Sequence, residues 1–105
     1  MEDKLKNRIY EYLMKGNKFL GKHKLELAFK SYVKGLYVAS TYLVYRDTGM
    51  LLPPHDAIRI LQSRYPDVYD VVTFYSRFQG EISEVILGKI KRDLEDICDS
   101  LISKF

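Results

Sequence analysis

The sequence contains few of the residues that build disulfides, metal sites and common nucleotide-binding loops. Its single cysteine, Cys98, excludes a disulfide within the chain, and its two histidines, His23 and His55, lie on different segments. It has no CxxC or HExxH pair, no Walker glycine loop and no GxGxxG motif. We therefore expect no metal site and no cofactor. Cys98 continues an apolar face with Ile90 and Leu94 and is expected to be a packed structural thiol.

The sequence also lacks a long uncharged segment. Its N-terminus, MEDKLKNR, is charged and has no apolar core of the kind that signal peptides carry. A helix that crosses a bilayer needs about 20 predominantly apolar residues. The longest uncharged run here, residues 35–45, is too short for that. We therefore expect a cytoplasmic protein with no membrane partner.

The segment 25–45, LELAFKSYVKGLYVASTYLVY, organises the rest of the chain. A helix that is apolar around most of its circumference must be covered on most of it. At 105 residues the chain forms a single domain, 1–105. We therefore predict an all-α fold, an antiparallel up-and-down bundle of four to five helices around a long central helix 2 at about residues 24–47. Two helical stripes carry this prediction: Ala28, Tyr32, Gly35, Ala39 and Tyr42 in one, and Phe29, Val33, Leu36, Ser40 and Leu43 in the other.

Apolar periodicity predicts the remaining helices. Gly21 is expected to end helix 1 in a left-handed conformation. Pro66 is expected either to separate helix 3 from helix 4 or to kink one continuous helix. Met50, Leu51 and Leu52 are expected to pack against the end of the bundle. The expected boundaries are about 2–20 for helix 1, 54–64 for helix 3, 67–78 for helix 4, and 81 to nearly the end for helix 5, whose apolar face runs from Ile82 to Phe105 and is widened by Val85.

The charge of the chain is unevenly distributed. The net charge is +3, but residues 1–35 hold nine Lys or Arg and four Asp or Glu, a balance of +5. A basic face of this kind can attract a phosphate backbone. The alternative is an ordinary solvated face of two amphipathic helices. The lysines concerned are Lys4, Lys6, Lys15, Lys18, Lys22, Lys24, Lys30 and Lys34.

One polar constellation stands out, at the junction between helix 2 and helix 3. Arg46 and Asp47 close helix 2, and His55 and Arg59 lie in the first turns of helix 3. An arginine can hold a phosphodiester while a neighbouring imidazole moves a proton, which suits metal-free RNA cleavage. Arg46 and His55 are therefore candidate catalytic residues. Arg46, Asp47, His55 and Arg59 are candidate nucleotide- or nucleic-acid-binding residues. The alternative is structural, because helix dipoles favour a cation where helix 2 ends.

Residues 25–61 resemble the HEPN family of small helical bundles. The resemblance lies in the long helix rich in alanine and aromatic residues, the GMLLP junction, and the His55-Asp56 pair that opens the next helix. It implies a four- or five-helix bundle that dimerises. Some members are ribonucleases, and others are non-catalytic partners of minimal nucleotidyltransferases or bind nucleotides or nucleic acid. Catalytic members have four to six residues between their arginine and histidine, whereas eight residues separate Arg46 from His55.

Three functions are compatible with these observations. The one we favour is a non-catalytic, dimeric, HEPN-like module that binds a partner protein, such as a nucleotidyltransferase, or a nucleotide or nucleic acid. The second is a metal-independent endoribonuclease of the toxin–antitoxin or RNA-processing type, in which Arg46 and His55 come from two subunits. The third is an RNA- or DNA-binding adaptor that uses the lysine face of helices 1 and 2. Its binding would weaken steeply with salt.

Overall fold

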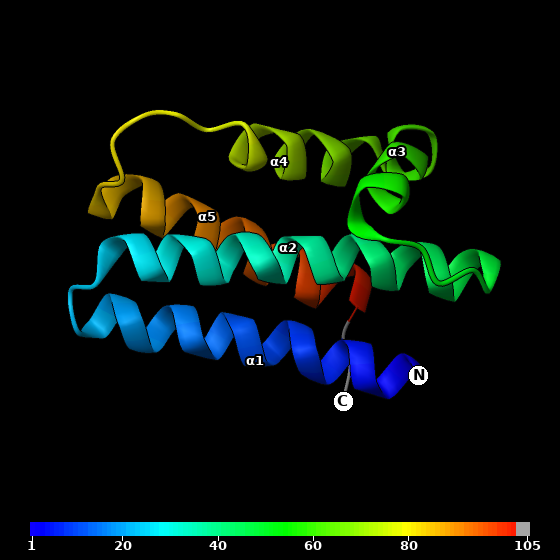
Figure 1. The fold of residues 1–105 in the computed structure, drawn as a ribbon, viewed down its shortest axis with the longest axis horizontal. Coiled ribbons are helices and arrows are strands. Elements are labelled where there is room, and N and C mark those ends of the chain that lie inside the picture. The colour runs from blue at the N-terminus through cyan, green and yellow to red at the C-terminus, as the bar shows by residue number, and fades with distance from the viewer. Residues whose placement is uncertain (103–105) are drawn as a thin grey trace.

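The fold is built around one long helix, α2, against which the rest of the chain packs. The computed structural model describes residues 1–102, and within them α2 contacts each of the other helices. Figure 1 shows α1 antiparallel to α2 on one side, α3 and α4 on the opposite side, and α5 passing behind. The predicted all-α bundle is confirmed. In residues 1–102 the chain forms five α-helices and no strand: α1 (Glu2–Gly21), α2 (Leu25–Thr48), α3 (Pro54–Arg64), α4 (Pro66–Ser76) and α5 (Glu84–Ile97), with a π-helical turn (Cys98–Ile102) after α5.

Both predicted stripes of α2 face the interior. Tyr32, Leu36 and Ala39 are fully buried, and Tyr42 is 1% exposed. Gly35 lets α5 come close, because a Cβ there would lie 2.9 Å from Cδ2 of Leu94. The central position of α2 therefore follows from the apolar and small residues that cover most of its circumference. No helix within residues 1–102 is both long enough and apolar enough to span a bilayer.

The turn between α1 and α2 differs from the prediction. Gly21 is the last residue of α1, and the left-handed residue is His23, with φ of 58°. The amide of Lys24 donates to the carbonyl of Phe19 at 2.8 Å, and the amide of His23 donates to the carbonyl of Leu20 at 3.0 Å. These bonds satisfy the carbonyls at the end of α1. The left-handed residue therefore lies two positions later than predicted. Histidine is one of the residue types that enter the left-handed region more readily than most.

The ends of α2 and α3 match the prediction. Gly49 ends α2 with φ of 77°, and its amide donates to the carbonyl of Tyr45 at 2.8 Å. Tyr65 leaves the helical region with φ of −140° and ψ of 71°, as a residue before proline does. The third and fourth helices are therefore two separate helices, and Pro66 opens the second of them.

The start and the buried face of α5 required correction. The helix begins at Glu84 rather than Glu81, because the Ser83 hydroxyl accepts the amide of Ile86 at 3.4 Å and caps the first turn. The buried face of α5 includes Leu87, which the prediction left out, whereas Val85, which was expected to widen that face, is 84% exposed. The predicted apolar face is correct at Ile90, Leu94 and Ile97, which are buried. Its predicted end, Phe105, lies outside the described residues.

The connection between α2 and α3 is more exposed than predicted. Met50 and Leu51 are 49% and 52% exposed, so they do not pack against the end of the bundle. Leu52 does pack against the core, and its carbonyl accepts the hydroxyl of Thr41 at 3.3 Å. This single anchor leaves the two preceding side chains pointing away from the core.

Candidate functional site

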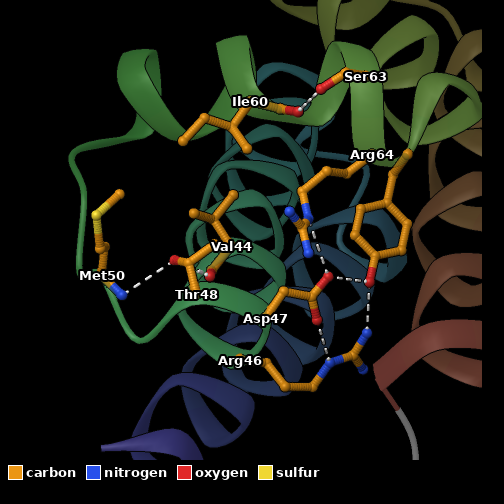
Figure 2. A network of polar contacts seen from close by, with 9 residues as sticks. Val44, Arg46, Asp47, Thr48, Met50, Ile60, Ser63 and Arg64 are labelled. Carbon is orange, nitrogen blue, oxygen red and sulfur yellow. Dashed lines mark hydrogen bonds and ion pairs between the residues drawn. The ribbon is translucent and has the colours of Figure 1, made fainter.

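Arg46 lies in a polar cluster that joins the end of α2 to two other parts of the bundle. Its Nη2 donates to the Tyr65 hydroxyl at 2.8 Å, and its Nε donates to Oδ1 of Asp47 at 3.3 Å. Its Nη1 donates to the carbonyl of Leu101 in the π-helical turn. Arg64, at the end of α3, lies 3.6 Å from the other carboxylate oxygen of Asp47. Figure 2 shows Arg46, Asp47 and Arg64 converging at this point.

The contacts within this cluster favour the ionised forms of Arg46 and Asp47. The hydrogen bond from Tyr65 is the largest influence on Asp47 and lowers the pKa of its carboxyl, with Arg46 and Arg64 acting in the same direction. Burial and the bond to Asp47 raise the pKa of the Tyr65 phenol. Burial by itself would lower the pKa of Arg46, but the bonds to Tyr65 and Asp47 leave it above its ordinary value. Each charged side chain of the cluster therefore has a partner within it.

His55 and Arg59 lie in a different place, in a cleft of about 630 Å³ between α2, α3 and α4. We call it the α3–α4 cleft. Neither Arg46 nor Asp47 lines it. The structure therefore divides the four predicted binding residues into two groups, Arg46 with Asp47 and His55 with Arg59. Joint action of Arg46 and His55 across two subunits stays a prediction. The cleft is lined by Tyr37, Pro54, His55, Ile58, Arg59, Gln62, Tyr69, Thr73, Ser76 and Arg77.

The α3–α4 cleft carries positive charge without a counter-ion. Two arginines and His55 line it, and no carboxylate does. Within residues 1–102, the guanidinium group of neither Arg59 nor Arg77 forms a hydrogen bond or an ion pair. Their guanidinium groups thus retain all of their donors for a ligand. By contrast, the guanidinium donors of Arg46 already form hydrogen bonds within the protein.

The walls of the cleft combine flat apolar surface with polar tips. Tyr37 from α2, Tyr69 from α4 and Ile58 from α3 are half-buried and pack against the core. The hydroxyl of Thr73 donates to the carbonyl of Tyr69 at 2.8 Å, and that of Ser76 donates to the carbonyl of Thr73 at 3.2 Å. Both hydroxyls can still accept a hydrogen bond. The cleft can therefore hold a ligand that has an anionic end and a planar, partly apolar body.

The other predicted features of the surface are placed as follows. The lysine face lies along α1, the following turn and α2, and all of its lysines except Lys6 are exposed. The ammonium of Lys15 lies 5.7 Å from the ring of Tyr12. Among residues 1–102 there is no group of three or more His, Cys, Asp or Glu that could hold a metal ion.

Sequence reasoning did not single out Arg77, Gln62 or the two tyrosines of the cleft. Tyr69, Thr73 and Arg77 follow one another at four-residue spacing along α4 and its end, so they share one face. Testing the polar positions of α4 for helical periodicity would have found this face. The contacts of Tyr65 with Arg46 and of Arg64 with Asp47 were also missed, because they depend on how α3 and α4 fold back over the end of α2.

Comparison with known proteins does not assign the chain to a family. No family model, no curated protein and no solved structure matches it.

Proposed function

We propose that the protein is a HEPN-like, non-catalytic binding module that holds a nucleotide in the α3–α4 cleft. The observation that supports this proposal is the pair of arginines, Arg59 and Arg77, which line one cleft with neither a carboxylate nor a partner of their own. Arginine presents a planar fork of donors that matches a phosphate. Two such groups at one cleft favour a ligand with a phosphate.

The dimensions and walls of the cleft favour a nucleotide over a bare anion. Its volume of about 630 Å³ lies within the range of about 300–1,000 Å³ that is usual for small-ligand sites. The rings of Tyr37 and Tyr69 supply flat surface for a base, and the amide of Gln62 can both donate and accept hydrogen bonds. His55 adds an imidazole nitrogen beside the arginines.

The non-catalytic part of the proposal is supported by the contacts of Arg46. Its guanidinium donates to Tyr65, Asp47 and the carbonyl of Leu101, so three of its nitrogens already have partners. A group used in this way holds helices together. To clamp a phosphodiester beside His55, Arg46 would have to leave these partners.

The proposed module forms a dimer and has a partner protein such as a nucleotidyltransferase, as the resemblance implies. None of the nine tyrosines is exposed, so a dimer surface that includes tyrosine would have to use half-buried rings. The half-exposed side chains of Met50 and Leu51 offer a further apolar surface. Light scattering at micromolar concentration should give twice the monomer mass, and a monomer mass would contradict this part of the proposal.

Titration with adenosine 5′-monophosphate tests the binding site. Calorimetry should give saturable binding to the wild-type protein, with adenosine and inorganic phosphate each binding more weakly. Arg59→Gln should weaken the binding of the nucleotide about tenfold or more, because it removes a charge-assisted hydrogen bond. The matched control is Arg92→Gln on α5, an exposed arginine whose side chain has no hydrogen bond or ion pair in residues 1–102.

Equal weakening in Arg59→Gln and Arg92→Gln would contradict the cleft as the binding site, as would the lack of saturable binding. Catalysis is tested separately. RNA incubated with the wild-type protein in EDTA should remain intact. Cleavage that disappears in His55→Ala would replace the binding module with the endoribonuclease.

A further inference from the structure

A second hollow continues from the α3–α4 cleft across α4. It has a volume of about 450 Å³ and is lined by Asp70, Thr73, Phe74, Arg77, Phe78 and Gln79. Thr73 and Arg77 line both hollows. The guanidinium-bearing side chain of Arg77 therefore stands at the boundary between them. A ligand longer than one nucleotide could pass along this wall without leaving the surface of α4.

Phe74 gives the second hollow an aromatic surface that is fixed and accessible. Its side chain is 50% exposed, although phenylalanine is usually buried. Its ring packs edge-to-face against Tyr75, with centroids 5.0 Å apart, and lies 6.0 Å from the ring of Phe78. The ammonium of Lys89 on α5 lies 5.7 Å from the centroid of Phe74. These neighbours hold the ring in place while half of it remains open to solvent.

From this arrangement we infer that the ligand is a single-stranded nucleic acid, and that it extends from the α3–α4 cleft past Arg77 to Phe74. The inference rests on the proposed function and specifies its ligand class. A phosphate lies in the cleft with Arg59 and Arg77, and the base of the adjacent nucleotide stacks on Phe74. Alternating cations and exposed rings are the usual means by which proteins hold single strands without reading their sequence.

The charges of the two hollows determine which part of the strand each one takes. The α3–α4 cleft has no carboxylate among its lining residues, so it suits a phosphate. The second hollow includes the carboxylate of Asp70 beside Phe74. This carboxylate offsets the charge of Arg77, so the second hollow attracts a phosphate less than the α3–α4 cleft does, whereas an uncharged base is tolerated. A paired base in a duplex could not lay its face on Phe74, so the strand must be single.

Fluorescence anisotropy with a labelled oligo-uridylate about six nucleotides long tests the inference. Phe74→Leu keeps an apolar side chain but removes the ring, and should weaken binding of the oligonucleotide about fivefold or more, because one stacked base is lost. The same change should leave the affinity for adenosine 5′-monophosphate unaltered. Leu27→Ala is the matched control, since Leu27 is 45% exposed and lines neither hollow.

Arg77→Gln should weaken the binding of both ligands. It should also lower the salt dependence of oligonucleotide binding by the amount expected for about one phosphate contact. Oligo-thymidylate in place of oligo-uridylate distinguishes DNA from RNA as the source of the strand. If Phe74→Leu binds the oligonucleotide as the wild type does, the inference is overturned, while a nucleotide site that depends on Arg59 would still stand. If Phe74→Leu instead abolishes dimer formation with oligonucleotide affinity unchanged, Phe74 belongs to a protein interface and the inference is likewise overturned.

Discussion

The hydroxyl of Tyr65 donates a hydrogen bond of 2.6 Å to Oδ2 of Asp47. Tyr65 is the residue at which α3 gives way to α4, and Asp47 lies in the last turn of α2. The same hydroxyl accepts a hydrogen bond from Arg46 at 2.8 Å. One phenol oxygen thus connects the break between two helices to the end of the central helix.

Tyr65→Phe should lower the free energy of unfolding by about 1–2 kcal/mol, because it removes a hydrogen bond to a charged carboxylate and leaves Arg46 with one partner fewer. Urea denaturation measures this. Tyr45→Phe is the control, since Tyr45 is also half-buried but its hydroxyl has no partner in residues 1–102. Its effect should stay within about 0.5 kcal/mol. Equal effects of the two substitutions would show that the Tyr65 hydroxyl contributes nothing specific.

The stabilisation that Asp47 provides should depend on pH. Its pKa in the folded protein lies below the ordinary value of 3.8, so the folded state binds this proton less tightly than the unfolded state. The contribution is therefore complete above about pH 3.8 and is lost as the pH falls through the lower folded value. The difference in unfolding free energy between the wild type and Asp47→Asn should be constant near neutral pH and shrink in acid.

Asp96→Asn is the matched control for this titration, because the exposed carboxylate of Asp96 has no hydrogen bond or ion pair in the described part of the chain. It should produce a smaller difference at every pH. A difference for Asp47→Asn that stays the same down to about pH 2 would mean that the carboxylate is not held by its neighbours in solution.

The close approach of α1 to α2 depends on the absence of a side chain at Gly16. A Cβ at this position would lie 2.6 Å from Cδ1 of the buried Tyr32 ring. The Tyr32 hydroxyl donates to Asn17 at 2.7 Å, so the ring cannot turn aside without losing that bond. Gly16→Ala should therefore destabilise the protein by about 1–3 kcal/mol, as overpacking does.

Gly88→Ala provides the matched comparison, since a Cβ at Gly88 would have no atom within 4 Å. In an exposed position of α5 this substitution should stabilise the protein by up to about 1 kcal/mol, because alanine is the better helix former. Thermal denaturation of both variants should thus shift in opposite directions. A shift in the same direction would mean that the two helices can separate at Gly16 at little cost.

Much of the fold could be predicted because α2 is apolar around most of its circumference. Such a helix requires neighbours on most of its sides, and local signals mark where it ends, such as Gly49, and where α3 ends, before Pro66. Two of the wrong predictions concern the choice between residues that lie close together in the sequence. His23 rather than Gly21 takes the left-handed position, and α5 begins after Ser83. Either choice is compatible with the same apolar pattern.

The candidate site could be predicted only in part. Arg46 and His55 are close in sequence, and sequence alone cannot show that one side chain packs back onto the end of α2 while the other faces α4. That outcome depends on the path of the connection through Leu52 and on the angle between α3 and α4 at Tyr65. Arg77 joins the cleft for the same reason, since the packing of α4 on α2 decides which of its faces turns toward α3.

The buried thiol of Cys98 should be protected from alkylation until the protein unfolds. Cys98 is 1% exposed, and burial, followed by the charge of Asp99, raises the pKa of its thiol to about 11. Only the thiolate reacts with iodoacetamide. At about pH 8 the folded protein should therefore be modified at least about a hundredfold more slowly than the same chain in urea, since the ordinary pKa of the thiol is 9.0. Mass spectrometry of timed samples measures both rates. A folded protein that reacts as fast as the unfolded chain would show that the turn after α5 opens readily and that Cys98 is not part of a closed core.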